Sequence, residues 1–324
     1  MRALVNTAPG ALELLERPTP EPGPGEVRIR TLACGICATD LERIAGWSRT
    51  PFPSIPGHEW CGVVDAVGPD VDASLVGMRC VGENVRRDGG EVGFEHPGGY
   101  GEFFLTEPHL LLPVPGHADP AAATLLEPLA VAVRGLRRAR IPGAPSNVRS
   151  PALVIGDGPI GLLLAMLLHA AGVKEIALAG GRPARLAAGR RLGASKTFNY
   201  HETPLGRIAG ESGFIAEASG SADALDAAVD LAPHGARILV IGDYGPACAR
   251  FAWNTVLHKE LELVGSNASH GAWTEAVRLA FDAEPPLPLA RLVTHVFPVD
   301  EFEAAFDTAR HVREAIKVVL AWES

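Results

Sequence analysis

Two short segments carry side chains that together could bind a transition metal. The first, Gly35–Asp40, supplies the thiolate of Cys37, a hydroxyl and a carboxylate within four residues. The second, Gly57-His58-Glu59, supplies an imidazole and another carboxylate. Zinc accepts sulfur, nitrogen and oxygen ligands together, and a catalytic zinc keeps one position open. Cys37 and His58 are therefore predicted ligands, and the rest of the chain should provide a third.

The cysteines leave a second interpretation of this segment open. Cys34 and Cys37 form a C-x-x-C pair, which is also typical of redox pairs and zinc knuckles. Cys34 is more simply a small buried residue. A lone histidine usually has a structural role, but His58 follows Cys37 in the order that a ligand pair requires. The number of cysteines is odd, five, and their spacing indicates no disulfide framework, which predicts a reduced protein in the cytoplasm.

Short strands are expected to position these residues. Residues 26–30 alternate polar and apolar side chains, as a half-buried strand does, and lead directly to Cys37. Residues 59–68 are typical of a strand followed by a turn, and residues 100–105 of another strand. Cys37 should therefore lie on a turn directly after a strand.

One carboxylate stands in an otherwise apolar run. Residues 121–135 are predicted to form a helix that contains Glu127. Because an unpaired charge in an apolar surrounding is costly, Glu127 needs a partner, and a zinc ion would satisfy it. The alternative is a carboxylate near a helix N-terminus, stabilised by the helix dipole.

The middle of the chain indicates a dinucleotide site. Residues 152–165 read as a buried strand, a glycine turn and an apolar helix, with G-x-G-x-x-G between strand and helix. In that context the glycines allow a tight turn, a close approach of the pyrophosphate and helix packing. The predicted contacts in this turn are Gly156, Gly158, Pro159, Ile160 and Gly161.

The end of the second strand, residues 175–179, predicts which cofactor is preferred. NAD-specific enzymes place a carboxylate there to bind the ribose 2′-hydroxyl. This chain instead has Gly180 followed by Arg182 and Arg185, and a guanidinium can pair with a 2′-phosphate. We therefore expect NADP(H) to be preferred over NAD(H). Arg182 is the stronger candidate, since Arg185 fits equally well as a surface residue of the next helix.

Strands and helices continue to alternate along the chain, and together predict a six-stranded doubly wound parallel sheet. Two residues lie at the carboxyl ends of strands, where such sheets bind ligands: Ser219 and Gly242. They are candidates for the nicotinamide side, or plain turns. The further strands are expected at 197–200, 214–218, 237–242 and 261–265.

Two motifs resemble one enzyme family. The motif G-I-C-x-T-D around Cys37, followed by G-H-E-x-x-G-x-V-x-x-V-G from Gly57, is similar to the medium-chain dehydrogenase/reductase superfamily. The resemblance is to its zinc-dependent alcohol and polyol branch, like sorbitol, threonine and glucose dehydrogenases, and covers nearly the whole chain. It implies an α/β fold: a GroES-like β-barrel catalytic domain (1–128 with 267–324) and a Rossmann domain with a doubly wound parallel sheet (129–266).

The resemblance also implies roles for single residues. Cys37 and His58 would bind zinc, and Asp40 would orient the histidine. Thr39 would hydrogen-bond the substrate oxygen and pass on its proton. The remaining implied roles are Glu59 as a ligand or a close carboxylate, Glu127 (from the motif E-P-L) at or near the metal, and Lys317 near the cofactor phosphates or exposed on a strand edge.

The sequence departs from the family in two places. Many relatives have a histidine where this chain has Glu42, which can still accept protons or is a surface residue. Many also bind a structural zinc through four cysteines, but residues 81–99 contain none, and Cys80 alone cannot close a tetrahedral site. We expect one catalytic zinc and no structural zinc. The segment 81–99 would border the active site or an oligomer contact, or be a shortened surface loop.

Composition limits the partners. The 324 residues carry a formal charge of −9, which argues against nucleic acid or an anionic membrane as partner. The N-terminal residues indicate no signal peptide, and family habit suggests a homodimer or homotetramer.

The predicted function is a zinc-dependent hydride transfer between NADP(H) and a small-molecule substrate. This substrate is expected to be a secondary alcohol or ketone of a polyol, sugar or cyclitol. The alternatives are a zinc-free quinone or enone reductase of the same superfamily, and a non-catalytic NADPH-binding protein.

Overall fold

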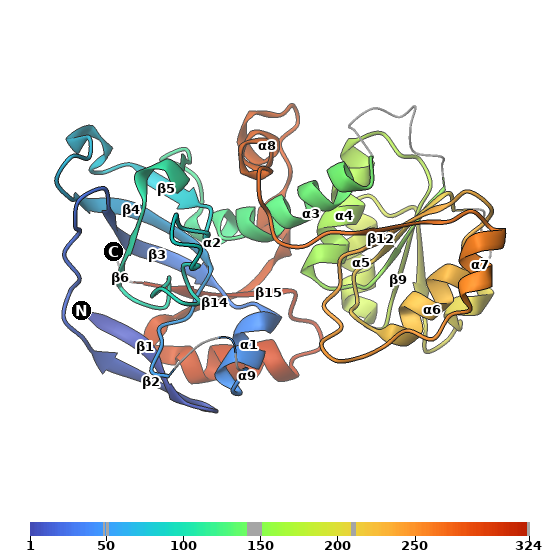
Figure 1. Ribbon diagram of the computed structural model, residues 1–324, viewed down its shortest axis with the longest axis horizontal. Coiled ribbons are helices and arrows are strands. Elements are labelled where there is room, and N and C mark those ends of the chain that lie inside the picture. Colours follow the sequence, from blue (N-terminus) through green and yellow to red (C-terminus); the bar gives the residue numbers. More distant parts are fainter. Residues whose placement is uncertain (48, 50–51, 141–150, 209–211, 323–324) are drawn as a thin grey trace. The chain divides into compact units, whose positions relative to one another are not determined.

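The computed structural model describes the chain except for residues 48, 50–51, 141–150, 209–211 and 323–324. The chain divides into two compact units (Figure 1). The first unit contains Met1–Glu127 and Trp273–Ser324, and the second contains Pro128–Ala272.

The first unit is built mainly of antiparallel strands. A two-stranded sheet pairs β1 with β2, and a larger sheet has the order β14-β15-β3-β4-β5-β7, with β6 also paired to β3. The strands are β1 (Arg2–Ala8), β2 (Ala11–Glu16), β3 (Val27–Gly35), β4 (Glu59–Val67), β5 (Arg79–Gly82), β6 (Phe103–Thr106), β7 (Leu111–Pro113), β14 (Val293–Pro298) and β15 (Lys317–Ala321). The helices are α1 (Ala38–Ile44), α2 (Pro120–Ala123), α8 (Trp273–Val277), α9 (Phe302–His311) and the start of α3 (Leu126–Arg138).

The register of three strands in this unit gathers distant parts of the chain. β3 and β4 are antiparallel, and Gly35 at the end of β3 lies opposite Glu59 at the start of β4. β15 runs antiparallel to β3 on its other side, where Val319 lies opposite Gly35. The predicted strands at 26–30 and 59–68 are thus confirmed, and Cys37 follows β3 as expected.

The second unit is a six-stranded parallel sheet in the order β10-β9-β8-β11-β12-β13, flanked by helices (Figure 1). The predicted doubly wound sheet is confirmed. Its strands are β8 (Ala152–Ile155), β9 (Ile176–Gly180), β10 (Lys196–Asn199), β11 (Phe214–Glu217), β12 (Arg237–Val240) and β13 (Glu262–Gly265). Its helices are α4 (Pro159–Ala170), α5 (Pro183–Arg191), α6 (Ala222–Leu231) and α7 (Trp253–His258), with most of α3.

The single helix expected over residues 121–135 is wrong. The structure has two helices there, α2 and α3, which are interrupted at Thr124 and Leu125. Pro128 lacks the N–H that a helix interior needs, but the first turn of a helix tolerates this. The chain therefore starts a new helix just before Pro128, and Glu127 lies in its first turn.

Over the part of the chain that the structure describes, no helix combines the length and the apolar character needed to cross a membrane.

Candidate metal centre and cofactor site

Three predicted side chains meet in the first unit. Cys37 caps α1 and is half-buried, His58 directly precedes β4, and Glu59 is its first residue. One ligand atom from each lies within 4.8 Å of the other two. A thiolate, an imidazole and a carboxylate at this spacing form a donor set that suits zinc.

Asp40 lies against the imidazole of His58. Its Oδ1 lies 3.2 Å from Nδ1 of the histidine, while Oδ2 accepts hydrogen bonds from the Cys37 N–H (3.0 Å) and the Tyr100 hydroxyl (3.1 Å). Burial alone would lower the pKa of His58, but Asp40 and Cys37 raise it well above its ordinary value. Because Nδ1 faces Asp40, Nε2 is the nitrogen left for a metal, an arrangement common to metal-binding histidines.

Lys317 neutralises Glu59. The lysine Nζ lies 2.8 and 2.6 Å from the two carboxylate oxygens and 3.2 Å from the carbonyl of Ile36. Burial lowers the pKa of Lys317, but the nearby carboxylate offsets this and the net pKa is raised. Lys317 is only 2% exposed, so the alternative of an exposed residue on a strand edge is wrong. Its predicted contact with cofactor phosphates stays a prediction.

Gly35 leaves the space that this ion pair needs. A Cβ at Gly35 would lie 2.3 Å from Oε2 of Glu59 and 3.3 Å from Cδ of Lys317. Any side chain at this position would therefore displace the carboxylate from the lysine.

The other predicted residues of this centre lie around the three-residue group. The Thr39 hydroxyl oxygen is 3.7 Å from Sγ of Cys37. Glu127 is not part of the group within 4.8 Å, and its role as a ligand stays a prediction. Burial raises the pKa of Glu127 to about 7. Glu42 is exposed, and Cys34 is fully buried as expected.

The cysteine-free segment 81–99 packs against the histidine. Asn84 accepts a hydrogen bond from Nε1 of Trp60 (3.0 Å) and donates one to the carbonyl of His58 (2.9 Å). The Phe94 ring lies 5.0 Å from the imidazole, and the Phe94 carbonyl accepts a hydrogen bond from Arg43 (2.7 Å). The interpretation as a plain surface loop is therefore wrong.

The glycine motif of the second unit forms the expected turn. Gly156 has a φ of +120°, and a Cβ there would lie 2.8 Å from the backbone of Ala218. A Cβ at Gly161 would lie 1.9 Å from the Gly156 carbonyl. Gly158 caps α4, and Pro159 begins it. Apart from the glycine's own chain neighbours, no atom of the residues that the structure describes lies within 4 Å of the Cβ position of Gly158. The start of α4 thus has room for a phosphate close to its backbone.

Further predicted residues follow the carboxyl ends of strands in the same sheet. Because all six strands are parallel, Gly180 at the end of β9, Ser219 after β11 and Gly242 after β12 belong to one edge. A groove of about 560 Å³ lies at the ends of β12 and β13. Gly242 lines it, together with Arg134 and Arg138 of α3.

The two arginines expected at the 2′-phosphate lie at the start of α5. Arg182 caps the helix, is partly exposed and lies 2.9 Å from Asp157 (Nη1 to Oδ1). Arg185 is half-buried in the first turn.

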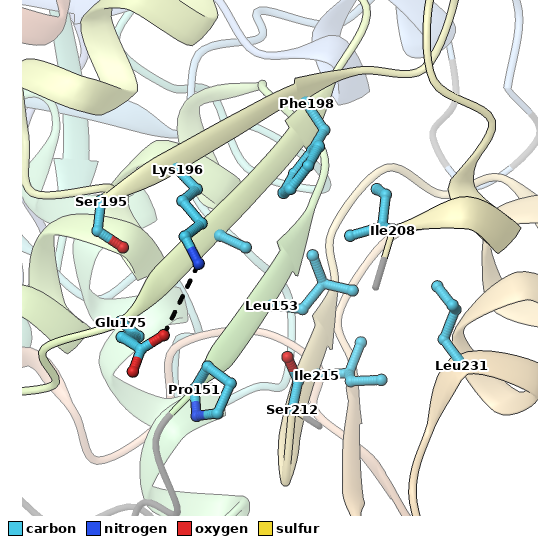
Figure 2. A pocket seen from close by; sticks show the side chains of 11 residues that line it. Pro151, Leu153, Glu175, Ser195, Lys196, Phe198, Ile208, Ser212, Ile215 and Leu231 are labelled. Atoms are coloured by element: carbon cyan, nitrogen blue, oxygen red, sulfur yellow. Dashed lines mark ion pairs between the residues drawn. The ribbon is translucent and has the colours of Figure 1, made fainter. Parts of the chain in front are cut away.

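A second, small cavity lies at the opposite edge of this sheet (Figure 2). It has a volume of about 80 Å³. Its lining includes three residues that directly precede strands, Pro151, Glu175 and Ser195, together with residues inside those strands such as Leu153 and Phe198. Lys196 and Glu175 form an ion pair of 3.9 Å beside it (Figure 2). It includes none of the predicted cofactor residues.

The sequence did not predict a role for several residues of the two sites. Tyr100, Asn84 and Phe94 lie far from the metal motifs, and nothing in their spacing indicates a role. Asp157 is different, because it stands inside the glycine motif, where a carboxylate beside a phosphate site is unexpected. Glu217 is also buried at a strand end, bound by the Ser219 N–H (2.8 Å) and by the hydroxyl of Tyr244.

Comparisons with known proteins agree with this architecture. Residues 23–116 match the alcohol dehydrogenase GroES-like domain, and residues 120–322 match the glucose dehydrogenase C-terminus. The chain is 32% identical to the D-altritol 5-dehydrogenase of Agrobacterium fabrum (strain C58) over all of both chains. It is 29% identical to the L-threonine 3-dehydrogenase of Chelativorans sp. (strain BNC1), over 99% of each.

A solved structure is similar over the same length. A short chain alcohol dehydrogenase from E. coli CFT073, complexed with NADH, superposes with a TM-score of 0.91 at 25% identity, over 99% of each chain. The family models and the relatives agree with the resemblance expected from the two metal motifs and with the two-part α/β fold. The chain therefore belongs to the medium-chain dehydrogenase/reductase superfamily, in the zinc-dependent branch of NAD(P)-dependent alcohol and polyol dehydrogenases.

Proposed function

We propose that this enzyme transfers a hydride between NADP(H) and a secondary alcohol or ketone of a polyol, sugar or cyclitol. The observation that carries the proposal is the group of Cys37, His58 and Glu59, with its ligand atoms within 4.8 Å of one another. The similarity to a D-altritol 5-dehydrogenase supports a polyol as substrate. A homo-oligomer in the cytoplasm remains our expectation.

The residues present fit one catalytic zinc. Cys37 and His58 would hold it, with Glu59 or Glu127 as the third protein ligand. When bound, zinc supplies Lewis-acid chemistry that lowers the pKa of a substrate hydroxyl. Asp40 keeps the imidazole of His58 in one orientation, and Lys317 balances the charge of Glu59.

In this proposal Thr39 handles the substrate proton. Its hydroxyl oxygen lies 3.7 Å from the sulfur of Cys37, so an alcohol bound beside Cys37 would be close to it. Thr39 would accept the hydrogen bond of the alcohol and pass its proton toward solvent. The loss of a proton and a hydride converts the alcohol into a ketone.

The cofactor residues of the proposal belong to the second unit. The turn from Gly156 to Gly161 and the start of α4 would bind the pyrophosphate. Gly180 has no carboxylate side chain, and Arg182 would pair with the 2′-phosphate. NADP(H) would therefore be the preferred cofactor.

The test is NADP⁺ reduction by zinc-loaded protein across a panel of alditols, sugars and cyclitols, with and without a chelator. We expect one substrate class to be oxidised, with turnover lost on chelation and restored by zinc. Turnover that survives complete removal of the metal would contradict the mechanism and favour a zinc-free reductase. If the protein binds both zinc and NADPH but reduces NADP⁺ with no member of the panel, only the proposed substrate class is contradicted.

A further inference from the structure

Asp157 extends from the glycine turn to the end of the neighbouring strand β9. Its Oδ2 accepts hydrogen bonds from the backbone N–H groups of Gly181 (2.9 Å) and Arg182 (2.8 Å). Its Oδ1 accepts one from Nη1 of Arg182 (2.9 Å). One carboxylate therefore holds both the turn after β9 and the guanidinium expected at the 2′-phosphate.

Gly180 makes this position of the carboxylate possible. A Cβ at Gly180 would lie 2.5 Å from Cβ and 2.6 Å from Oδ2 of Asp157. A side chain at the end of β9 and the side chain of Asp157 therefore exclude each other. In dinucleotide-binding folds the carboxylate that binds the ribose 2′-hydroxyl comes from the end of the second strand. Here a carboxylate reaches that place from the glycine turn.

Arg182 covers this carboxylate. The Asp157 side chain is 4% exposed, whereas that of Arg182 is 42% exposed. An arriving ribose would meet the guanidinium first, with the carboxylate directly behind it. The two groups carry opposite charges, so the pair is neutral overall, and a 2′-phosphate gains less from it than from an arginine alone.

We propose that Asp157 is a specificity-determining residue that restrains the preference for NADP(H) and keeps NAD(H) a usable cofactor. The proposal rests on the proposed contact between Arg182 and the 2′-phosphate. The negative charge of Asp157 opposes the phosphate, while the neutral 2′-hydroxyl of NAD(H) meets no such repulsion. Asp157 thus acts on the choice of cofactor through Arg182.

The proposal is tested by titrating zinc-loaded protein with NADPH and NADH and measuring both dissociation constants by nucleotide fluorescence. In Asp157→Asn the amide oxygen can still accept from the two backbone N–H groups. Its NH₂ group, however, faces Nη1 of Arg182, another donor, and releases the guanidinium. Compared with wild type, we expect the ratio of the NADH to the NADPH dissociation constant to rise about tenfold, which corresponds to roughly 1.4 kcal/mol.

A second variant, Arg182→Ala, uncovers Asp157 instead of releasing the guanidinium. We expect the opposite change, a loss of about tenfold or more in NADPH binding relative to NADH, because an exposed carboxylate then faces the 2′-phosphate. Asp223→Asn, an exposed acid in the first turn of α6, is the matched control for the charge change and should leave the ratio unaltered.

The decisive quantity is the ratio of the two dissociation constants. If Asp157→Asn weakens both cofactors equally, Asp157 only anchors the turn and the proposal is overturned. A wild-type protein that binds NADH but not NADPH would contradict the proposed NADP preference. In that case a gain of NADPH binding by Asp157→Asn still supports the role of Asp157, and no gain overturns it.

Discussion

The two units support their buried carboxylates in different ways. In the first unit, Glu59 is held by Lys317, which lies 258 residues away in the sequence, and Asp40 is bound by Tyr100, 60 residues away. In the second unit, Asp157 is paired across 25 residues with Arg182, and Glu217 binds the N–H of Ser219, only two residues later. The most distant partners of these carboxylates lie 258 and 60 residues away in the first unit, but only 25 and 27 residues away in the second, where Tyr244 also binds Glu217.

This difference follows from the sheets. In the parallel sheet of the second unit, the consecutive strands β8 and β9 lie side by side, so the residues that follow them, Asp157 and Arg182, come together. In the first unit β15, from the end of the chain, joins the sheet beside β3. The metal motifs are therefore short stretches of sequence, but the charge that stabilises Glu59 arrives only when the end of the chain pairs with β3.

The largest effect is expected from Lys317→Met. This change leaves Glu59 buried without its counter-charge, because both side chains are almost fully buried in the wild type. Losing one partner of a buried pair costs about 3–5 kcal/mol. Urea unfolding of the metal-free protein should show a loss of this size, and the double variant Glu59→Gln/Lys317→Met should recover part of it. Lys174→Met changes an exposed lysine and is the control, which should have little effect on stability. An equal loss of stability in Lys317→Met and Lys174→Met would refute the pairing.

A smaller effect is expected from Asn84→Ala. The substitution removes the partner of Nε1 of Trp60 and of the His58 carbonyl, both in the interior. Leaving such groups unsatisfied costs about 1–3 kcal/mol. The midpoint of thermal unfolding should fall, and zinc should be lost to a chelator faster than in wild type. Asn199→Ala is the control, since the amide of Asn199 forms hydrogen bonds with Glu202 and with the N–H of His201 at the surface. Wild-type kinetics of zinc loss in Asn84→Ala would show that segment 81–99 does not support the centre.

The smallest effect is expected for a pair on the second sheet. Arg237 of β12 donates to Glu262 of β13 at 3.0 and 2.8 Å, and this hydrogen bonding lowers the pKa of the Glu262 carboxyl below 4.5. A carboxyl whose pKa is lower in the folded than in the unfolded protein stabilises the fold at a pH above its unfolded-state pKa. This contribution is lost as the pH falls through its folded-state pKa. Glu262→Gln should therefore be slightly less stable than wild type at pH 7. The difference should disappear on acidification below pH 4.5, and a difference that grows there would contradict the pairing.

Local sequence patterns were enough to predict the second unit. The glycine motif, the apolar strands and the absence of a carboxylate at Gly180 all lie in contiguous stretches with their own periodicity. The pairing of Arg182 with Asp157 was missed because the motif treats the residue between its glycines as variable.

The first unit was predictable in its motifs and in the two strands that adjoin them, but not in the long-range contacts around them. Cys37 and His58 stand in recognisable segments, and the structure brings them together. Lys317 was assigned to the cofactor, because a sequence does not show that β15 pairs with β3. The break between α2 and α3 was missed as well, since apolar residues run through it and only Pro128 marks the new first turn.

The central claim is a single catalytic zinc held by Cys37 and His58. The most direct test is the zinc content per chain, measured by elemental analysis after reconstitution and dialysis. We predict one zinc per chain in the wild type and in Cys248→Ser, which alters an exposed cysteine of the second unit, and none in Cys37→Ser. A Cys37→Ser variant that retains its full zinc content, or a wild-type protein that binds none, would contradict this account.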